Sequence, residues 1–243
     1  MSGRFAIIAD IHANLTALEA VLEAVGGVDG VWCLGDIVGY GPQPNECAAR
    51  VAGFSGPTIR GNHDLGATGL TSLDRFNPYA KDACRWTSKA LSGEALDFLT
   101  GLPNPSDAIK KTLLVHGSPR DPFWEYVLTL GQAEDVFAST DERFVFVGHS
   151  HIPFIFSFSD GRVKLEKLSE GKNVLSEGAR YLINPGSVGQ PRDKDPRSSF
   201  MILDRGDYSI DYRRVPYSIS TVQAGIIDAG LPGFLAERLA LGE

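Results

Sequence analysis

Five short apolar segments in the first two thirds of the chain each end in glycine or in polar residues, and this repetition limits the folds open to the chain. Each segment has the length and composition of a buried strand, and the five are residues 4–9, 30–35, 57–60, 111–115 and 143–147. A helical pattern separates the first two, beginning after Asn14 or Thr16 and stopping at Gly26-Gly27. Strand–helix–strand units build parallel sheets, so the sequence predicts an α/β fold.

The remaining segments predict helices and antiparallel strands. From residue 153 onward the pattern alternates as in β-hairpins, with turn signals such as Asp160-Gly161. The predicted helical elements are short helices at residues 44–52 and 131–138, a polar insertion without a clear strand at about 65–110, and a cap at about 217–243. We therefore expect a single domain over residues 1–243, with two stacked sheets flanked by helices.

Composition narrows the class of protein. The 243 residues, 43% of them hydrophobic, suffice for one sizeable core. The net charge of −7 counts against a nucleic-acid groove, and no segment reaches the length of a membrane span. The three cysteines show no CxxC spacing, so we expect free thiols in a reducing cytoplasm. The insertion at 65–110 either covers the functional site or makes a homo-oligomer contact, and the sequence leaves both open.

All five histidines of the chain lie where the apolar segments end. The polar ends are Asp10-Ile11-His12, Gly35-Asp36, Gly61-Asn62-His63-Asp64, His116-Gly117 and Gly148-His149-Ser150-His151. Loops at the carboxyl ends of strands gather into one crevice in α/β sheets, so these side chains are expected to converge. On an extended chain, residues two apart point to the same side. By that rule each of the pairs Asp10/His12 and His149/His151 addresses one centre.

The residue types at these ends predict a metal site. Carboxylate, imidazole and amide ligands without a thiolate suit divalent Mn, Fe, Co, Ni or Zn. The number of ligands exceeds what one ion needs, so two ions sharing a bridging carboxylate are expected, as in enzymes of phosphoryl transfer. A single histidine after a strand is more often a packing or turn residue. Five such motifs together make the packing explanation the weaker one.

In their order along the chain, the motifs DIH (10–12), GDIVG (35–39), GNHD (61–64), HG (116–117) and GHSH (148–151) resemble those of the calcineurin-like metallophosphoesterase superfamily. The later NPGSVGQPRD (184–193) is similar to the single-domain phosphoesterases of bacteria and archaea in that superfamily. The resemblance implies a four-layer αββα sandwich of two mixed β-sheets flanked by helices. It also implies a phosphoesterase with two divalent ions, for which we favour manganese.

The resemblance assigns a role to each motif residue. The first ion would be held by Asp10, His12, Asp36 and His151. The second would share Asp36 and be held by Asn62, His116 and His149. A hydroxide bridging the ions would attack phosphorus, and His63 would stabilise the phosphoryl group or protonate the leaving oxygen. Asn62 would also orient the phosphate, so the catalytic residues are expected to be His63, Asn62 and Asp36.

One motif departs from the pattern of the protein phosphatases in this superfamily. Their GDxVDRG carries an Asp that orients the catalytic histidine and an Arg that grips phosphate, whereas this chain has Gly39 and Tyr40 at those places. A bidentate Arg–phosphate pair is not easily replaced, which disfavours protein-phosphatase and diadenosine-tetraphosphatase activity. Arg192 either supplies the missing charge or is a turn residue of its surface loop, whereas Arg60 is expected to be structural, under the GNHD loop. Arg192 and Tyr40 are the candidate substrate-binding residues.

We therefore expect hydrolysis of small phosphodiesters or phosphomonoesters, with diesters preferred. One alternative is a nucleotide or protein phosphatase that uses the same chemistry. Another is a non-catalytic metal-binding scaffold, which the retention of His63 and of every expected ligand disfavours. A DNA nuclease is disfavoured by the acidic net charge of −7.

Overall fold

Two β-sheets packed face to face form the centre of the computed structural model, which describes residues 3–243. Sheet A consists of β1 (Arg4–Ile8), β2 (Gly30–Cys33), β8 (Gly171–Val174), β10 (Ser198–Asp204) and β11 (Ser209–Val215), in the order β2-β1-β10-β11-β8. Sheet B consists of β3 (Ser106–Ile109), β4 (Thr112–Leu114), β5 (Phe144–Phe146), β6 (Phe154–Ser159), β7 (Arg162–Leu165) and β9 (Arg180–Asn184), in the order β3-β4-β5-β9-β6-β7.

Both sheets are mixed, which confirms the predicted αββα sandwich of two mixed sheets. In sheet A, β1 and β2 are parallel and the other neighbours are antiparallel. In sheet B, β4, β5 and β9 run parallel and the outer strands are antiparallel. The parallel strands of the first half of the chain therefore do not form one sheet, since they are divided between two.

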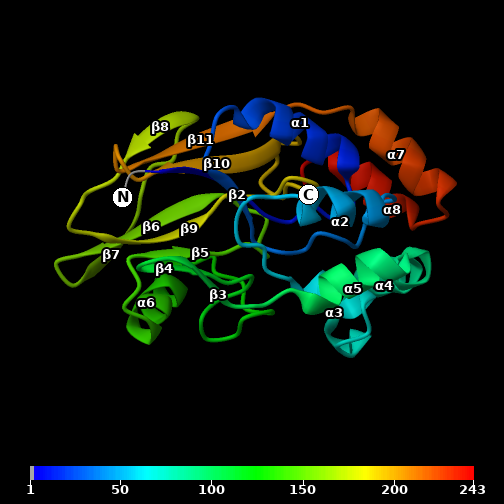
Figure 1. Ribbon diagram of the computed structural model, residues 1–243, viewed down its shortest axis with the longest axis horizontal. Coiled ribbons are helices and arrows are strands. Elements are labelled where there is room, and N and C mark those ends of the chain that lie inside the picture. Colours follow the sequence, from blue (N-terminus) through cyan, green and yellow to red (C-terminus); the bar gives the residue numbers. More distant parts are fainter. Residues whose placement is uncertain (1–2) are drawn as a thin grey trace.

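Successive side chains of a strand point alternately into the core between the two sheets and to the outer face of their sheet. Ile7 points into the core between the sheets together with Phe146, while Ile8 and Val145 point outward. Helix α1 (Leu15–Val25) covers the outer face of sheet A, and α6 (Leu130–Ser139) covers that of sheet B (Figure 1). Full burial of a side chain such as Ile8 stabilises the fold by roughly 1.5–3 kcal/mol.

The first residue of each of the helices α1, α2 (Pro44–Ala52) and α6 is set by a capping residue or a proline. The side chain of Asn14 accepts a hydrogen bond from the Ala17 N–H at 3.0 Å, so Asn14 and not Thr16 begins α1. Helix α2 has the predicted bounds and starts with a proline that needs no hydrogen-bond acceptor. Thr129 and Gln132 form a capping box at the start of α6.

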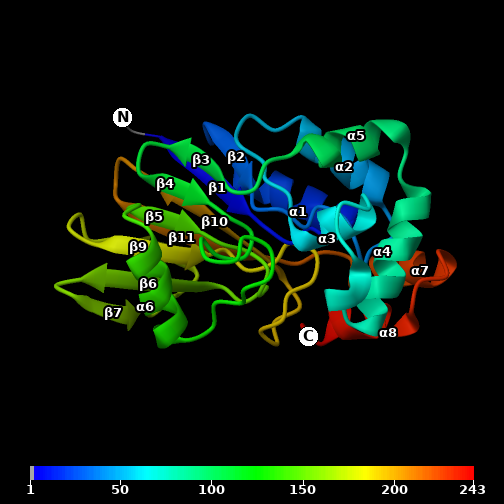
Figure 2. The same ribbon diagram turned by 90° about the horizontal axis from the view of Figure 1, so that it is seen from below.

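The remaining helices gather at one end of the sandwich, beside the sheets (Figure 2). They are α3 (Asn62–Ala67), η1 (Leu73–Arg75), α4 (Pro78–Ala90), α5 (Gly93–Gly101), α7 (Ile219–Asp228), α8 (Gly233–Glu237) and η2 (Arg238–Ala240). The predicted insertion and the predicted cap meet here, since Ala83 and Cys84 of α4 share one apolar cluster with Val222 and Leu235. No helix within residues 3–243 is both long and apolar enough to cross a membrane.

Two strand predictions were wrong. Residues 57–60 make only an isolated bridge, between Thr58 and Cys33, because the Arg60 N–H turns away to Pro103 O and α3 begins at Asn62. The insertion at 65–110 contains a strand, β3, which pairs antiparallel with β4 at the edge of sheet B. Its polar sequence SDAI and a turn through left-handed Lys111, without glycine, concealed the hairpin. Residues 1 and 2 of the predicted domain lie outside the described residues.

Candidate metal centre

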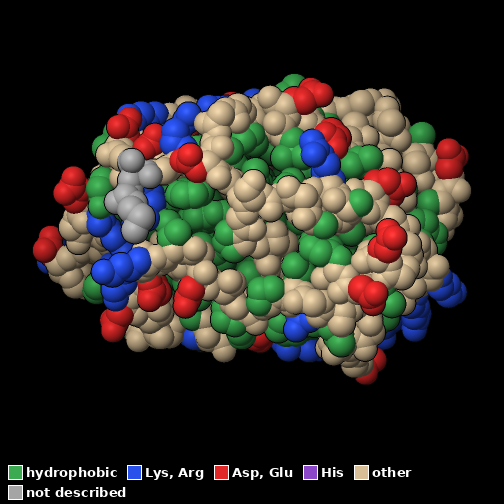
Figure 3. All heavy atoms as spheres, in the orientation of Figure 1, with side chains coloured by type: hydrophobic (Ala, Val, Ile, Leu, Met, Phe, Trp, Pro, Cys, Tyr) green, Lys and Arg blue, Asp and Glu red, His purple; other side chains and the backbone are tan. Residues whose placement is uncertain are grey.

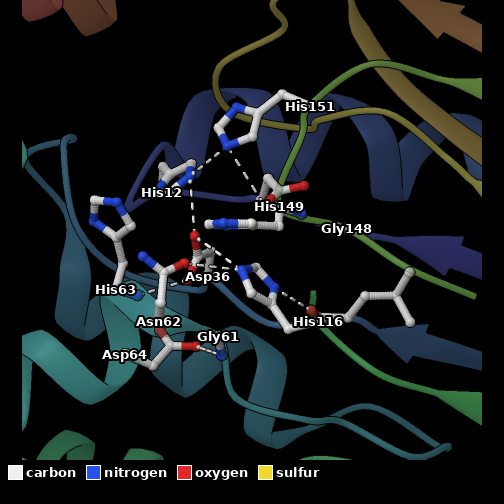
Figure 4. Close-up of polar contacts among 12 residues, drawn as sticks. His12, Asp36, Gly61, Asn62, His63, Asp64, His116, Gly148, His149 and His151 are labelled. Carbon is white, nitrogen blue, oxygen red and sulfur yellow. Dashed lines mark hydrogen bonds and ion pairs between the residues drawn. The ribbon is translucent and has the colours of Figure 1, made fainter. Parts of the chain in front are cut away.

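The polar residues at the strand ends lie together in the structure, with their side chains directed toward one another (Figure 4). Loops after β1 and β2 of sheet A and after β4 and β5 of sheet B contribute to the site, together with the first turn of α3. All are nearly inaccessible to solvent, with exposed fractions of 5% or less for Asp10, His12, Asp36, Asn62, His63, His116, His149 and His151. Such burial of polar groups is costly unless each has a partner.

Asp36 connects two groups of potential ligands. The first group is Asp10, His12, Asp36 and His151, and the second is Asp36, His116 and His149, with ligand atoms inside each group within 4.8 Å of one another. Asn62 adjoins the second group, since its Oδ1 lies 3.1 Å from His116 Nε2. The carboxylate Oδ2 of Asp36 lies 3.6 Å from His12 Nε2 and 3.3 Å from His116 Nε2, between the two groups.

The backbone of the site is left-handed, not extended. Asp10, His12, Asp36, His149 and His151 all have positive φ, between 51° and 64°. This conformation costs roughly 1–2 kcal/mol per residue, and it persists where surrounding structure determines it, often at functional sites. The extended-chain argument for the histidine pairs was therefore wrong. Asp10 and His12 do share a group, but His149 and His151 fall in different groups.

Backbone carbonyls fix the orientation of the histidines. Nδ1 of His12 lies 3.2 Å from Val38 O, and Nδ1 of His151 lies 2.5 Å from Gln190 O. A carbonyl only accepts hydrogen bonds, so each ring carries its proton on Nδ1 and turns the Nε2 lone pair inward. Burial lowers the pKa of both rings well below the ordinary imidazole value, so both are neutral at pH 7.

Unsatisfied atoms show that a cation fits both groups. His12 Nε2 and His151 Nε2 approach to 3.1 Å, and two facing lone pairs repel unless a cation lies between them. Asp10 Oδ2, Asp36 Oδ2 and His149 Nε2 are buried without a hydrogen-bond partner among residues 3–243. Buried polar atoms almost always have a hydrogen-bond partner or a bound ligand, so these three atoms are suited to bind a cation. The centre is a metal-binding site of Asp and His residues.

Burial and neighbouring charges together shift the pKa values of the site residues. At Asp36, burial acts to raise the pKa, but the surrounding histidines, first His116, hold it well below its usual range. Burial acts to lower the pKa of His116, but the Asp36 carboxylate raises it to about 9. Burial raises the pKa of Asp10 to about 7. Metal ligands must be deprotonated, so a cation competes with protons held by His116 and Asp10.

Residues of the GNHD motif have different roles, since some stabilise the local fold and others lie at the metal centre. Asp64 lies in neither ligand group, because its carboxylate accepts hydrogen bonds from Val38 N–H at 3.0 Å and Gly61 N–H at 2.8 Å and so caps α3. Gly61 packs directly on Asp36, where a Cβ would come 2.1 Å from Oδ1. His63 also lies outside both groups, and its N–H donates to Asp36 Oδ1 at 2.8 Å.

A cleft of about 200 Å³ opens beside the second ligand group. It is lined by Tyr40, Asn62, His63, Arg75, Phe76, Asn77, Ala80, Trp124, Tyr126 and His149. The ring of Tyr126 stacks on His149, with centroids 4.1 Å apart and planes 11° from parallel. His63 therefore borders the same cleft as Asn62 and as His149 of the second group.

The two candidate substrate-binding residues lie side by side. Tyr40 is 4% exposed and packs its ring on His63, with centroids 4.4 Å apart. The Arg192 guanidinium lies 5.8 Å from the Tyr40 ring and donates to Gln190 Oε1 at 2.9 Å. Its Nε is buried without a partner in the described part of the chain. The Arg60 guanidinium donates to Thr100 O at 2.8 Å, which agrees with the structural role expected for it.

Sequence reasoning missed the outer parts of the site. The cleft wall of Phe76, Trp124 and Tyr126 comes from the predicted insertion and from the loop before α6, which carry no motif at a strand end. Cys84 was expected only to be a free thiol, yet its Sγ lies 3.6 Å from His63 Nδ1. No local pattern marks these residues, since only the packing of the insertion against the strand ends brings them to the site.

The fold and this centre define a metal-dependent phosphoesterase. The family model of the calcineurin-like phosphoesterase superfamily domain matches residues 4–207. The chain therefore belongs to the calcineurin-like phosphoesterase superfamily and is a phosphoester hydrolase, as the motifs predicted.

Relatives over the full chain agree with this assignment. The chain is 44% identical over 243 residues to protein MJ0912 of Methanocaldococcus jannaschii, covering 98% of this chain and 97% of MJ0912. A crystal structure of a metallophosphoesterase from Sphaerobacter thermophilus is 43% identical with a TM-score of 0.90, covering 100% of each chain. The hypothetical protein PH1004 from Pyrococcus horikoshii OT3 is 21% identical with a TM-score of 0.80 over 99% of this chain and 98% of that one, which shows the fold alone.

Proposed function

We propose that the chain is a dinuclear metal-dependent hydrolase of small phosphodiesters or phosphomonoesters. The observation that carries the proposal is the position of Asp36, whose Oδ2 lies between two ligand groups and has no hydrogen-bond partner within residues 3–243. The first ion would be held by Asp10, His12, Asp36 and His151, and the second by Asp36, Asn62, His116 and His149. Oxygen donors from Asp10, Asp36 and Asn62 favour manganese among the divalent ions that imidazole also binds.

The roles of the protein side chains follow from their positions. When bound, two divalent ions supply positive charge that activates water and neutralises the phosphate oxygens. Asn62 stands at the edge of the second group and can orient a phosphate through its side-chain amide. Burial lowers the pKa of His63 to about 4, so its ring is neutral at pH 7. A neutral imidazole favours donation of a hydrogen bond to the phosphoryl or leaving oxygen over full proton transfer.

The cleft supports a small substrate. Its volume of about 200 Å³ lies below the range of roughly 300–1,000 Å³ of typical ligand pockets, so it suits one leaving group and not a length of peptide. Arg192 would add positive charge beside Tyr40, since its guanidinium lies 5.8 Å from that ring and its buried Nε has no hydrogen-bond partner within residues 3–243. The aromatic walls, Trp124 and Tyr126, favour a nucleotide phosphatase as the second candidate, because a base stacks on such rings.

Surface charge supports a substrate other than a long nucleic acid. On the face shown in Figure 3, Lys and Arg side chains are interspersed with Asp and Glu and do not form one continuous basic surface. The net charge is −7. We also propose a reducing, cytoplasmic location, because Cys33, Cys47 and Cys84 are buried free thiols.

A substrate panel tests the proposed function. Protein loaded with manganese is expected to hydrolyse bis-p-nitrophenyl phosphate faster than p-nitrophenyl phosphate, to act on some cyclic nucleotides, and to leave a phosphopeptide intact. The measurement is kcat/KM for each compound at equal metal content. A preference for the phosphopeptide contradicts the interpretation of Gly39 and Tyr40. Two bound ions with no turnover of any compound would indicate a scaffold.

A further inference from the structure

His63 differs from its neighbours in what its Nδ1 contacts. In His12, His116 and His151, Nδ1 faces a backbone carbonyl, which leaves Nε2 as the ligand atom. In His63, Nδ1 lies 3.6 Å from the Sγ of Cys84, within hydrogen-bond distance for sulfur. Cys84 lies in α4 of the insertion and is fully buried, so the contact is enclosed by the protein.

Two glycines make room for this pair. A Cβ at Gly39 would lie 2.6 Å from His63 Nδ1, closer than real contacts allow, so no side chain at position 39 can share that side of the ring. A Cβ at Gly66 would lie 3.1 Å from the Cys84 Sγ. The thiol is thus the side chain that the packing brings to Nδ1.

A protonated thiol can donate a hydrogen bond to an imidazole nitrogen. Burial raises the pKa of Cys84 well above the ordinary thiol value, so it remains a protonated thiol with an S–H to donate. Nδ1 of His63 is the acceptor within 3.6 Å of that sulfur. If S–H donates to Nδ1, a neutral His63 ring carries its own proton on Nε2. This is the opposite tautomer from that of His12 and His151.

We propose that Cys84 is a positioning residue that holds His63 in the tautomer protonated on Nε2, with that N–H available to the cleft. A ligand histidine needs a free Nε2 lone pair, whereas a hydrogen-bond donor to phosphate needs an Nε2–H. The contrast explains why His63 borders both ligand groups and belongs to neither. The catalytic consequence rests on the proposed function, but the tautomer does not.

The tautomer is measured directly by two-bond ¹⁵N–¹H correlation of protein labelled with ¹⁵N-histidine and loaded with zinc. In the unaltered chain, His63 is expected to show its proton on Nε2, and Cys84→Ala is expected to shift it toward Nδ1 or to a mixture. A His63 proton on Nδ1 in the unaltered chain overturns the proposal, and so does a spectrum that Cys84→Ala leaves unchanged. This readout holds even if the chain turns over no phosphoester, in which case the proposed function fails by itself.

Kinetics test the catalytic consequence. Loss of one weak hydrogen bond is worth about 1.4 kcal/mol, so Cys84→Ala is expected to lower kcat about tenfold, with KM and metal content unchanged. Cys84→Ser keeps a donor and is expected to restore most of kcat. Cys47→Ala removes another fully buried thiol, in α2, and is expected to leave kcat unchanged. Equal losses in Cys84→Ser and Cys84→Ala, no loss in Cys84→Ala, or loss of metal from it would each overturn the positioning role.

Discussion

Replacing Asp36 by asparagine is expected to remove most of the bound metal and to lower phosphoesterase turnover on the order of a thousandfold. Both ligand groups contain Asp36, and its Oδ2 lies 3.3 Å from His116 Nε2 and 3.6 Å from His12 Nε2. A neutral amide supplies no negative charge to two cations. The expected loss corresponds to about 4 kcal/mol, in keeping with the several kcal/mol that metal ions supply to the transition state.

Metal content and turnover should be measured on the same Asp36→Asn sample. Asparagine keeps the size of the side chain and can still accept the 2.8 Å hydrogen bond from His63 N–H, so the fold should be retained, as thermal unfolding would check. The matched control is Asp207→Asn, since the Asp207 side chain is 61% exposed and forms an ion pair with Lys172 at the surface. Normal metal content and turnover in Asp36→Asn would refute the shared-ligand interpretation.

His63→Ala is expected to lower kcat about 10²–10³-fold, the range for loss of one positioned hydrogen-bond donor to developing charge, while both ions stay bound. His63 lines the cleft but lies outside both ligand groups, so its loss removes a contact to the reacting phosphate and no ligand. KM should change little, because the hydrogen bond would strengthen mainly in the transition state. The measurement is kcat, KM and metal content of the same preparation.

His116→Ala provides the contrast to His63→Ala. His116 is fully buried and lies in the second ligand group, so its removal is expected to lower metal content and turnover together. If His63→Ala loses metal in the same way, His63 is a ligand or a structural residue and its proposed role is wrong. If His63→Ala keeps full kcat, it has no part in the reaction.

The layers of the fold were predictable because apolar periodicity reports burial. Residues 4–9 and 143–147 read as buried strands, and Ile7 and Phe146 do pack between the sheets. The polar edge strands β3 and β8 carry no such pattern, since SDAI and GKNV lie partly in solvent. Segment 57–60 (PTIR) was interpreted as a strand, but its chain turns toward α3 after a single bridge. The sequence of one segment does not indicate how far a neighbouring strand pairs with it.

The sequence predicts which residues form the site, but it does not predict how their side chains are arranged. The motifs placed His149 and His151 in one crevice, where both lie. Their division between two groups follows from the left-handed backbone at 149 and 151, which an extended-chain rule does not describe. Contacts between distant segments, such as Cys84 on His63, depend on packing of the insertion and have no sequence signal.

Anomalous diffraction from crystals loaded with manganese tests the central claim most directly. We predict two peaks roughly 3.5–4 Å apart, one on each side of the Asp36 carboxylate. The first should contact His12 and His151, and the second His116 and His149. A single peak, or two peaks of which neither contacts Asp36, would contradict the dinuclear site.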